Sequence, residues 1–322
     1  MRSNNTKEAD LVKSKKKSKI FLAVIIVLLI AVVASLFSVS LNLYKYVFER
    51  RFESAKEYML SPDSFEGLIR EKYTFASDKG QSLVGYKYYK SGDNKAVIVM
   101  AHGFGGGGHN SYMAIADYFA SNGYIVFAYD ATGNDESGGE EVGGMPQGVI
   151  DLSHAISFVK ESPDFAGLPV MLFGHSWGAY SCGTVLNFQK DVKAAVLAAG
   201  FNKSLDVFEE EAGRKAGDGI KFLMPFVSVI DRIKFGQYAS KTCTSGFESS
   251  DAGVMLIHSK DDDVVSFDKQ FAVFREKYQN DSRFVFIAFE NRGHNRLFNP
   301  NGSLDTELMN KITAFYDSYL KK

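Results

Sequence analysis

From residue 96 to the C-terminus, short apolar runs alternate with segments in which apolar residues recur every three or four positions. The apolar runs are residues 96–101, 124–129, 170–173, 192–199, 254–258 and 284–288. The segments with helical periodicity are residues 115–120, 149–159, 177–188, 267–278 (with Ser266 as its cap) and 304–319. Continuous apolar runs are typical of strands buried on both faces, and intervening helices favour parallel pairing. The sequence therefore predicts an α/β fold with a mostly parallel sheet that helices cover on both faces.

Two stretches depart from this alternation. Residues 73–76 and 83–89 are rich in aromatic residues and flank the turn residues Asp78-Lys79-Gly80, which predicts a hairpin of two strands. Residues 200–252 interrupt the alternation and contain an apolar run at 220–230 that is broken by Pro225 and too short to span a bilayer. We expect this insertion to form a small helical cap with apolar walls over the sheet edge.

Residues 20–43 form an almost wholly apolar segment without charge. The segment directly follows lysines at positions 13, 15, 16, 17 and 19. About 20 apolar residues in a helix span a bilayer, and a positive cluster before the span keeps the N-terminus in the cytoplasm. We therefore predict a cytoplasmic basic tail over residues 1–19, a single-pass anchor in the lipid bilayer of the cell membrane over 20–43, and an extracytoplasmic remainder.

A cleaved signal peptide is the alternative interpretation of this segment. Val32-Val33-Ala34 offers a passable cleavage site, but the apolar region of a signal peptide is shorter, at about 7–15 residues. Length therefore favours the anchor. Residues 44–69 are expected to be a stalk or linker, helical over 44–60 by its apolar spacing, and residues 70–322 to be the folded domain.

Net charge and cysteine content argue against two classes of function, nucleic-acid binding and metal binding. The formal net charge is −1, which gives no electrostatic basis for binding nucleic acid. Cys182 and Cys243 lack the spacing of metal ligands, and two cysteines do not make a disulfide framework. Two buried thiols are favoured over one bridge, and no metal site is expected.

The sequence Gly174-His175-Ser176-Trp177-Gly178 joins a predicted strand to a predicted helix. This is the context that a G-x-S-x-G nucleophile elbow requires. The sharp reversal strains Ser176 and leaves no room for side chains at 174 and 178, so both are Gly. The turn also places Ser176 at a helix N-terminus, which favours developing negative charge. Ser176 is therefore the predicted nucleophile.

A serine hydroxyl is a weak nucleophile unless a base removes its proton. His294 is the best candidate, because it lies in a turn-rich loop after the last predicted strand. The other histidines fit less well: His154 in a helical pattern, His175 expected to point away from the elbow, His258 at the end of a buried strand and His109 in a flexible glycine-rich loop.

A catalytic histidine needs a carboxylate on its other ring nitrogen, to fix its tautomer and stabilise its protonated form. In the order serine, acid, histidine, the acid should follow a strand between residues 176 and 294. Asp261, Asp262 and Asp263 all qualify. Loop register favours Asp262, which stands one residue before Val264-Val265.

Acyl transfer also needs backbone N–H groups that bind the oxyanion. One is expected to be that of Trp177, directly after the nucleophile, and the other that of Phe104, in the glycine-rich loop 102–108 after a strand. Gly103 and its neighbours allow the backbone to approach a substrate. His102 is interpreted as a residue that holds this loop rather than as a base. A phosphate-binding loop is disfavoured, because G-K-[ST] is missing.

Together these motifs resemble the α/β-hydrolase superfamily, particularly its monoacylglycerol-lipase-like and serine-aminopeptidase-like branch. The resemblance covers residues 70–322 and includes residues 130–139, which look like the D-x-x-G-x-G-x-S loop of the family with Asp135 where Gly is usual. It implies a mostly parallel eight-stranded sheet, a cap after the sixth strand, no cofactor, and hydrolysis of esters, thioesters, amides or peptides.

We expect a carboxylic ester with an apolar acyl or alkyl part as the substrate, because the cap run is apolar and the anchor keeps the domain near lipid. One alternative is a peptidase that removes N-terminal residues of short peptides, in which Glu209–Glu211 and Asp218 of the cap would hold the substrate amine. An alternative of another class is a non-catalytic surface binding protein on a hydrolase scaffold. Binding alone does not require an intact serine, acid, histidine and oxyanion loop.

Overall fold

The structure is a computed structural model that describes the backbone of residues 2–321 and most side chains from residue 13 onward. Its centre is one sheet of eight strands in the order β1-β2-β4-β3-β5-β6-β7-β8. The strands are β1 (Ile69–Ala76), β2 (Ser82–Tyr89), β3 (Ala96–Ala101), β4 (Tyr124–Tyr129), β5 (Val170–His175), β6 (Ala194–Ala198), β7 (Gly253–Ser259) and β8 (Phe284–Phe289). β1 and β2 form the predicted hairpin, β2 pairs antiparallel with β4, and all other neighbours are parallel. The predicted mostly parallel eight-stranded sheet is confirmed.

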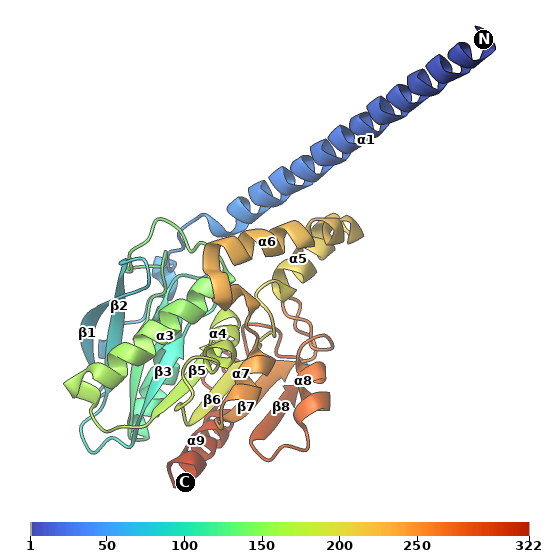
Figure 1. The fold of residues 1–322 in the computed structure, drawn as a ribbon. Coiled ribbons are helices and arrows are strands. Elements are labelled where there is room, and N and C mark those ends of the chain that lie inside the picture. The colour runs from blue at the N-terminus through green and yellow to red at the C-terminus, as the bar shows by residue number, and fades with distance from the viewer. Residues whose placement is uncertain (1, 322) are drawn as a thin grey trace.

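Helices cover both faces of the sheet (Figure 1). They are α2 (Met113–Ser121), α3 (Met145–Glu161), α4 (Trp177–Val185), α8 (Phe271–Tyr278) and α9 (Thr306–Leu320). Side chains of α3, α4 and α8 share one hydrophobic cluster, whereas those of α2 and α9 share the cluster on the opposite face. Adjacent residues of β3 divide between the two: Val97 and Val99 belong to the first cluster, and Ile98 and Met100 to the second. This division follows from the alternation of side chains along a strand.

The insertion between β6 and β7 contains α5 (Asp206–Ala216), α6 (Met224–Phe235) and α7 (Cys243–Ser249). The first two helices form the cap, whereas α7 packs on α4 beside the sheet (Figure 1). The helix expected from Ser266 onward begins only at Phe271. Glu210 of α5 accepts hydrogen bonds from the Ser266 backbone N–H and the Gln270 side chain, so residues 266–270 form a turn against the cap instead.

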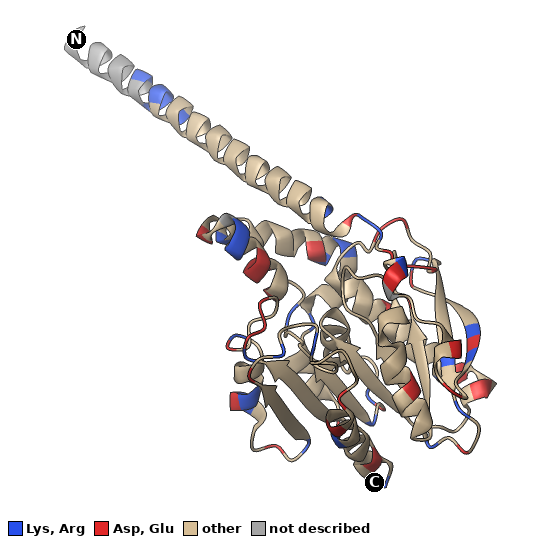
Figure 2. Ribbon diagram, turned by 180° about the vertical axis from the view of Figure 1, so that it is seen from behind, with Lys and Arg blue, Asp and Glu red and all other residues tan. Residues whose placement is uncertain are grey.

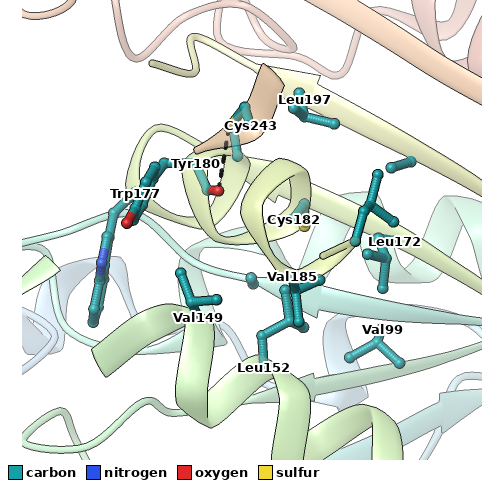
Figure 3. Close-up of a cluster of buried hydrophobic side chains, with 14 of the residues drawn as sticks. Val99, Val149, Leu152, Leu172, Trp177, Tyr180, Cys182, Val185, Leu197 and Cys243 are labelled. Carbon is teal, nitrogen blue, oxygen red and sulfur yellow. Dashed lines mark hydrogen bonds between the residues drawn. The ribbon is translucent and has the colours of Figure 1, made fainter. Parts of the chain in front are cut away.

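The helix α4 is buried along its whole length and packs between α3 and α7 (Figure 3). The approach of α7 is close: a Cβ on Gly246 would lie 2.1 Å from the carbonyl oxygen of Gly183. Cys182 and Cys243 are both buried free thiols. The Cys243 thiol lies within 3.2 Å of the Phe201 carbonyl and 3.4 Å of the Tyr180 carbonyl, so it is a packing residue with a polar contact.

The helix α1 (Arg2–Phe48) projects from the domain (Figure 1). Its part from Lys15 to Phe48 is long and apolar enough to cross a membrane by length and composition. Lysines gather at the start of this part, and the following turns carry no charge until the helix reaches the domain (Figure 2).

The segment expected to be a helical stalk over residues 44–60 differs from that expectation. The helix ends at Phe48, and both Tyr44 and Phe48 are fully buried against the domain. Phe52 is extended: its N–H donates to the Gly133 carbonyl at 2.9 Å, and its carbonyl accepts from the Asp135 N–H at 3.0 Å. The apolar face that suggested a free helix is covered by the domain itself.

Candidate active site

The elbow forms where β5 ends at His175 and α4 begins at Trp177. Ser176 between them has φ 54° and ψ −113°, a backbone conformation that L-residues avoid. A Cβ on Gly174 would lie 2.3 Å from the Gly178 carbonyl oxygen, and one on Gly178 would lie 2.0 Å from the Ala101 carbonyl oxygen. Both glycines are therefore required by contact between backbones, which is the steric argument drawn from the sequence.

The three predicted side chains meet at this elbow. The Ser176 hydroxyl lies 2.9 Å from Nε2 of His294, over a sequence separation of 118 residues. The Nδ1–H of His294 donates to Oδ2 of Asp262 at 2.8 Å. His294 and Asp262 are each only 8% exposed. This geometry allows the imidazole to accept the serine proton while the carboxylate stabilises the resulting charge.

The surroundings of Asp262 keep it ionised. Its Oδ1 accepts the backbone N–H groups of Val264 and Val265 at 2.9 and 2.8 Å, and Nε2 of His258 lies 3.2 Å from its Oδ2. Burial raises the pKa of Asp262, but the hydrogen bonds from His258 and His294 outweigh burial and hold that pKa well below its ordinary range. The contact with His258 could not be read from sequence, because it depends on how the loop folds back over β7.

The two neighbouring carboxylates are placed differently. Asp261 is exposed, and its Oδ1 accepts the Ser259 hydroxyl and the Gly293 backbone N–H, the latter at 2.8 Å. Asp263 is also exposed. Asp261 therefore links the acid loop to the residue before His294, whereas Asp262 alone of the three contacts the imidazole.

A chain of hydrogen bonds that sequence reasoning missed connects the two sides of the site. The Gly103 N–H donates to the Tyr112 hydroxyl at 3.2 Å, the Tyr112 hydroxyl donates to Nδ1 of His175 at 2.8 Å, and Nε2–H of His175 donates to the His294 carbonyl at 2.9 Å. Burial lowers the pKa of His175 to about 4, so the ring is neutral at pH 7 and can hold this tautomer. His175 thus positions the backbone of His294.

His102 and His109 make hydrogen bonds that fix the conformation of the loops around them. His102 donates through Nδ1 to the Gly103 carbonyl at 2.8 Å and accepts the Ala131 N–H on Nε2 at 3.0 Å. His109 was expected in a flexible loop, but it is buried between the Asp130 carboxylate and the Tyr88 hydroxyl, each at 2.7 Å. Buried polar partners, which the glycine-rich sequence does not reveal, fix this part of the chain.

The two predicted oxyanion donors lie on adjoining elements. Trp177 is the first residue of α4, where a backbone N–H has no partner within the helix. Phe104 is in the loop after β3, and its ring contacts that of Trp177 edge-on at 5.7 Å between centroids. The rings of Phe48 and Phe52 also contact Phe104, at 5.8 and 4.8 Å. The loop with the predicted donor is therefore packed against the chain that leaves α1.

Asp135, which stands where the family loop usually has Gly, connects the same parts. It keeps a positive φ of 34°. Its carboxylate accepts the Ser54 backbone N–H and hydroxyl, each at 2.6 Å, and the Gly108 N–H at 2.8 Å. The Arg51 guanidinium donates to three carbonyl groups of the same loop, those of residues 135, 137 and 139. Asp135 in place of the usual Gly is thus explained by the hydrogen bonds that its carboxylate accepts from the segment after α1.

Removing residues 1–60 is expected to destabilise the domain and lower its turnover, relative to a fragment of residues 44–322. The shorter fragment loses two fully buried aromatic residues, Tyr44 and Phe48, and a buried Phe→Ala change alone costs about 3–5 kcal/mol. It also leaves Asp135 and Phe104 without their partners from Phe52 and Ser54. Thermal melting and ester turnover of the two fragments measure this. Equal melting temperatures would show that the segment is a dispensable stalk.

Comparisons with known proteins agree with the architecture. Residues 92–229 match the family model described as serine aminopeptidase, S33. No curated protein matched the sequence. Among solved structures, the Pyrococcus furiosus esterase Pf2001 is similar with a TM-score of 0.65 at 15% identity, over 84% of this chain and 99% of that one. The α/β hydrolase GrgF from Penicillium sp. is similar with a TM-score of 0.59 at 18% identity, over 79% and 100% of the two chains.

An acylaminoacyl peptidase from Pyrococcus horikoshii is also similar, with a TM-score of 0.59 at 17% identity, over 81% of this chain and 43% of that one. At these identities the likeness of the solved structures concerns the fold. The fold and the matched family model confirm the resemblance seen in the sequence: the protein has the α/β-hydrolase fold, and its central residues match a serine aminopeptidase family model.

Proposed function

We propose that the protein is a serine hydrolase that acts by acyl transfer. The observation that carries this proposal is the continuous set of hydrogen bonds from Ser176 through His294 to Asp262, built on a strained elbow. A serine held at positive φ costs free energy, and such strain is found mainly where function requires it. The matched hydrolase family model supports the same activity.

In the proposed mechanism, Ser176 attacks the substrate carbonyl while Nε2 of His294 takes its proton. The backbone N–H groups of Phe104 and Trp177 bind the oxyanion, and each such donor is worth about 3–4 kcal/mol in the transition state. His294 then gives the proton to the leaving group. Water hydrolyses the acyl-enzyme with His294 again as base, and Asp262 stabilises the imidazolium in both halves.

We propose a carboxylic ester with an apolar acyl or alkyl group as the substrate. Phe104 is partly exposed and lies within an aromatic cluster formed with Phe48, Phe52 and Trp177. Phe208 of the cap extends this cluster by stacking on Phe48 at 5.8 Å. Aromatic walls beside the predicted oxyanion donor favour apolar groups near the reacting carbonyl.

A peptidase is the second candidate, because several acidic residues of the cap line one cavity. This cavity of about 630 Å³ lies between α5 and α8 and includes Glu209, Glu210 and Asp218. Ser176 and His294 are not among its lining residues. The Glu210 carboxylate already accepts hydrogen bonds from residues 266 and 270. The ester proposal is therefore preferred.

We further propose that α1 anchors the protein in a membrane, with the lysine-rich end in the cytoplasm and the hydrolase domain outside. The apolar side chains of residues 20–33 are exposed to the surroundings, as a lipid-facing helix requires.

Turnover of p-nitrophenyl esters from acetyl to octanoyl is expected to rise with acyl length in the detergent-solubilised full chain. Burying one CH₂ is worth about 0.8 kcal/mol, so kcat/KM should increase by up to about fourfold per added CH₂. Aminoacyl p-nitroanilides, assayed alongside, should be poor substrates. Turnover that is independent of acyl length would contradict an apolar acyl site, and faster cleavage of the anilides would favour the peptidase.

A further inference from the structure

The cap helix α6 carries a second apolar face that points away from the domain. Its inner face is buried through Val227, Ile230 and Phe235. On the outside, Val229 is 46% exposed and Ile233 74% exposed, and Phe222 in the turn before the helix is 75% exposed. A surface helix of a water-soluble domain normally presents polar residues there.

These exposed residues form one stripe. Positions 226, 229 and 233 of α6 are separated by three or four residues, so their side chains share one side of the helix, and Phe222 lies in the turn directly before that helix. Arg232, which is also exposed, borders the stripe near the end of α6 that packs on the domain. An apolar stripe bordered by a basic residue is the pattern of a helix that lies in a membrane interface.

The stripe is continuous with the surface of α1. The rings of Phe226 and Phe37 meet edge-on at 6.5 Å between centroids. Phe226 also lines a groove of about 470 Å³ against the α1 residues, which are Leu29, Ile30, Val33, Ala34 and Phe37. Every residue that lines this groove is apolar. In Figure 1, α6 runs beside the base of α1 on the side of the domain from which α1 projects.

The depth of this contact follows from the geometry of the helix. Phe37 follows Ile20 by 17 residues, which is a rise of about 26 Å at 1.5 Å per residue. The hydrocarbon core of a bilayer is about 30 Å thick. If the span begins directly after the lysines, Phe37 lies within the outer part of the hydrocarbon core. Phe226, which packs on Phe37, must then lie at a similar depth.

One buried polar contact joins α6 to the base of α1, and a second joins α6 to the loop after β6. The Tyr44 hydroxyl donates to the Asp231 carboxylate at 2.8 Å, and both residues are buried. The Ser204 hydroxyl donates to the other oxygen of Asp231 at 2.8 Å, so this carboxylate joins α1, α6 and the loop after β6. A membrane that holds α1 therefore also holds the cap at a fixed height.

We propose that the outer face of α6, from Phe222 to Ile233, docks among the acyl chains of the outer leaflet beside α1. The proposal rests on the membrane anchoring proposed above. The occupant is lipid rather than a second copy of the chain, because the groove opens along residues 29–37 of a helix that lipid already surrounds. The cap is then a second membrane contact, and the predicted site, whose Phe104 packs on Phe48 and Phe52 at the base of α1, lies near a source of acyl esters.

Tryptophan quenching in vesicles tests the docking without relying on catalysis. The full chain carrying Phe222→Trp is reconstituted in phosphatidylcholine vesicles with plain or dibrominated acyl chains; Phe222 is 75% exposed and lies at the end of the face nearest the bilayer, since the neighbouring Leu223 carbonyl accepts the Ser40 hydroxyl of α1. Leu29→Trp in α1 reports whether the anchor is inserted. Val285→Trp in β8 is the control, since Val285 is 37% exposed and β8, the last strand of the sheet, lies away from α1 and α6 in Figure 1. The signal of the native Trp177 is subtracted with the unsubstituted chain.

The brominated lipid is expected to reduce the fluorescence of Phe222→Trp and Leu29→Trp but not that of Val285→Trp. The loss at position 222 should persist when the protein is diluted in lipid, since a second copy would shield it at high density. Quenching at 29 without quenching at 222 would overturn the docking and leave the anchor intact. No quenching at either position would overturn both.

Discussion

Replacing Ser176 with Ala is expected to lower kcat for ester hydrolysis by about 10⁴- to 10⁶-fold. The variant retains the Cβ and the strained backbone, so the fold and the His294–Asp262 pair remain, but no nucleophile can form an acyl-enzyme. The residual rate would come from water positioned at the oxyanion donors. Initial rates on the best ester substrate, and labelling by a fluorophosphonate probe, measure the change.

Ser181→Ala is the matched control for this experiment. Ser181 lies on the helix that begins directly after Ser176, is buried, and donates its hydroxyl to the Trp177 carbonyl rather than to a histidine. It should keep its labelling and most of its turnover. Labelling of Ser176→Ala at the wild-type level would place the nucleophile elsewhere. No labelling of the folded wild type would favour a binding protein on a hydrolase scaffold.

The sheet was predictable because it is buried. Continuous apolar runs mark β3 and β4 with their observed bounds, because a strand that is covered on both faces carries apolar side chains on both. The elbow was predictable for a related reason. Gly174 and Gly178 are required by backbone contacts within a short segment, and local sterics can be read from a local motif.

The connections to the segment after α1 could not be predicted. The apolar spacing of residues 44–60 shows that one side of the segment is covered, but not what covers it. Tyr44 and Phe48 are buried by the cap and the oxyanion loop, and Phe52 pairs with residues that lie about 80 positions further along the chain. The hydrogen bonds from Tyr112 through His175 to His294 could not be predicted either, because each partner lies on a different element.

Asp262→Asn is expected to lower kcat by about 10⁴-fold while leaving the fold intact. The amide oxygen can still accept from Val264 and Val265, as the Asp262 Oδ1 does. The amide NH₂ then faces His294, whose Nδ1 must become an acceptor. Nε2 of the imidazole would carry the proton and could no longer accept the one from Ser176. Asp261→Asn is the control, since its side-chain oxygen still accepts the Gly293 N–H; it should retain most of the turnover.

The same variant should change the pH dependence of stability, with a sign fixed by the depressed pKa of Asp262. A carboxyl whose folded-state pKa lies below its unfolded value of about 3.9 stabilises the fold above that pH, and this contribution is lost as pH falls toward the folded pKa. Asp262→Asn lacks the contribution at every pH. The gap in melting temperature between wild type and variant should therefore be widest near pH 7 and shrink below about pH 4. A gap that stays constant down to pH 3, or turnover within tenfold of wild type, would mean that the Asp262 carboxylate does not act on His294 as proposed.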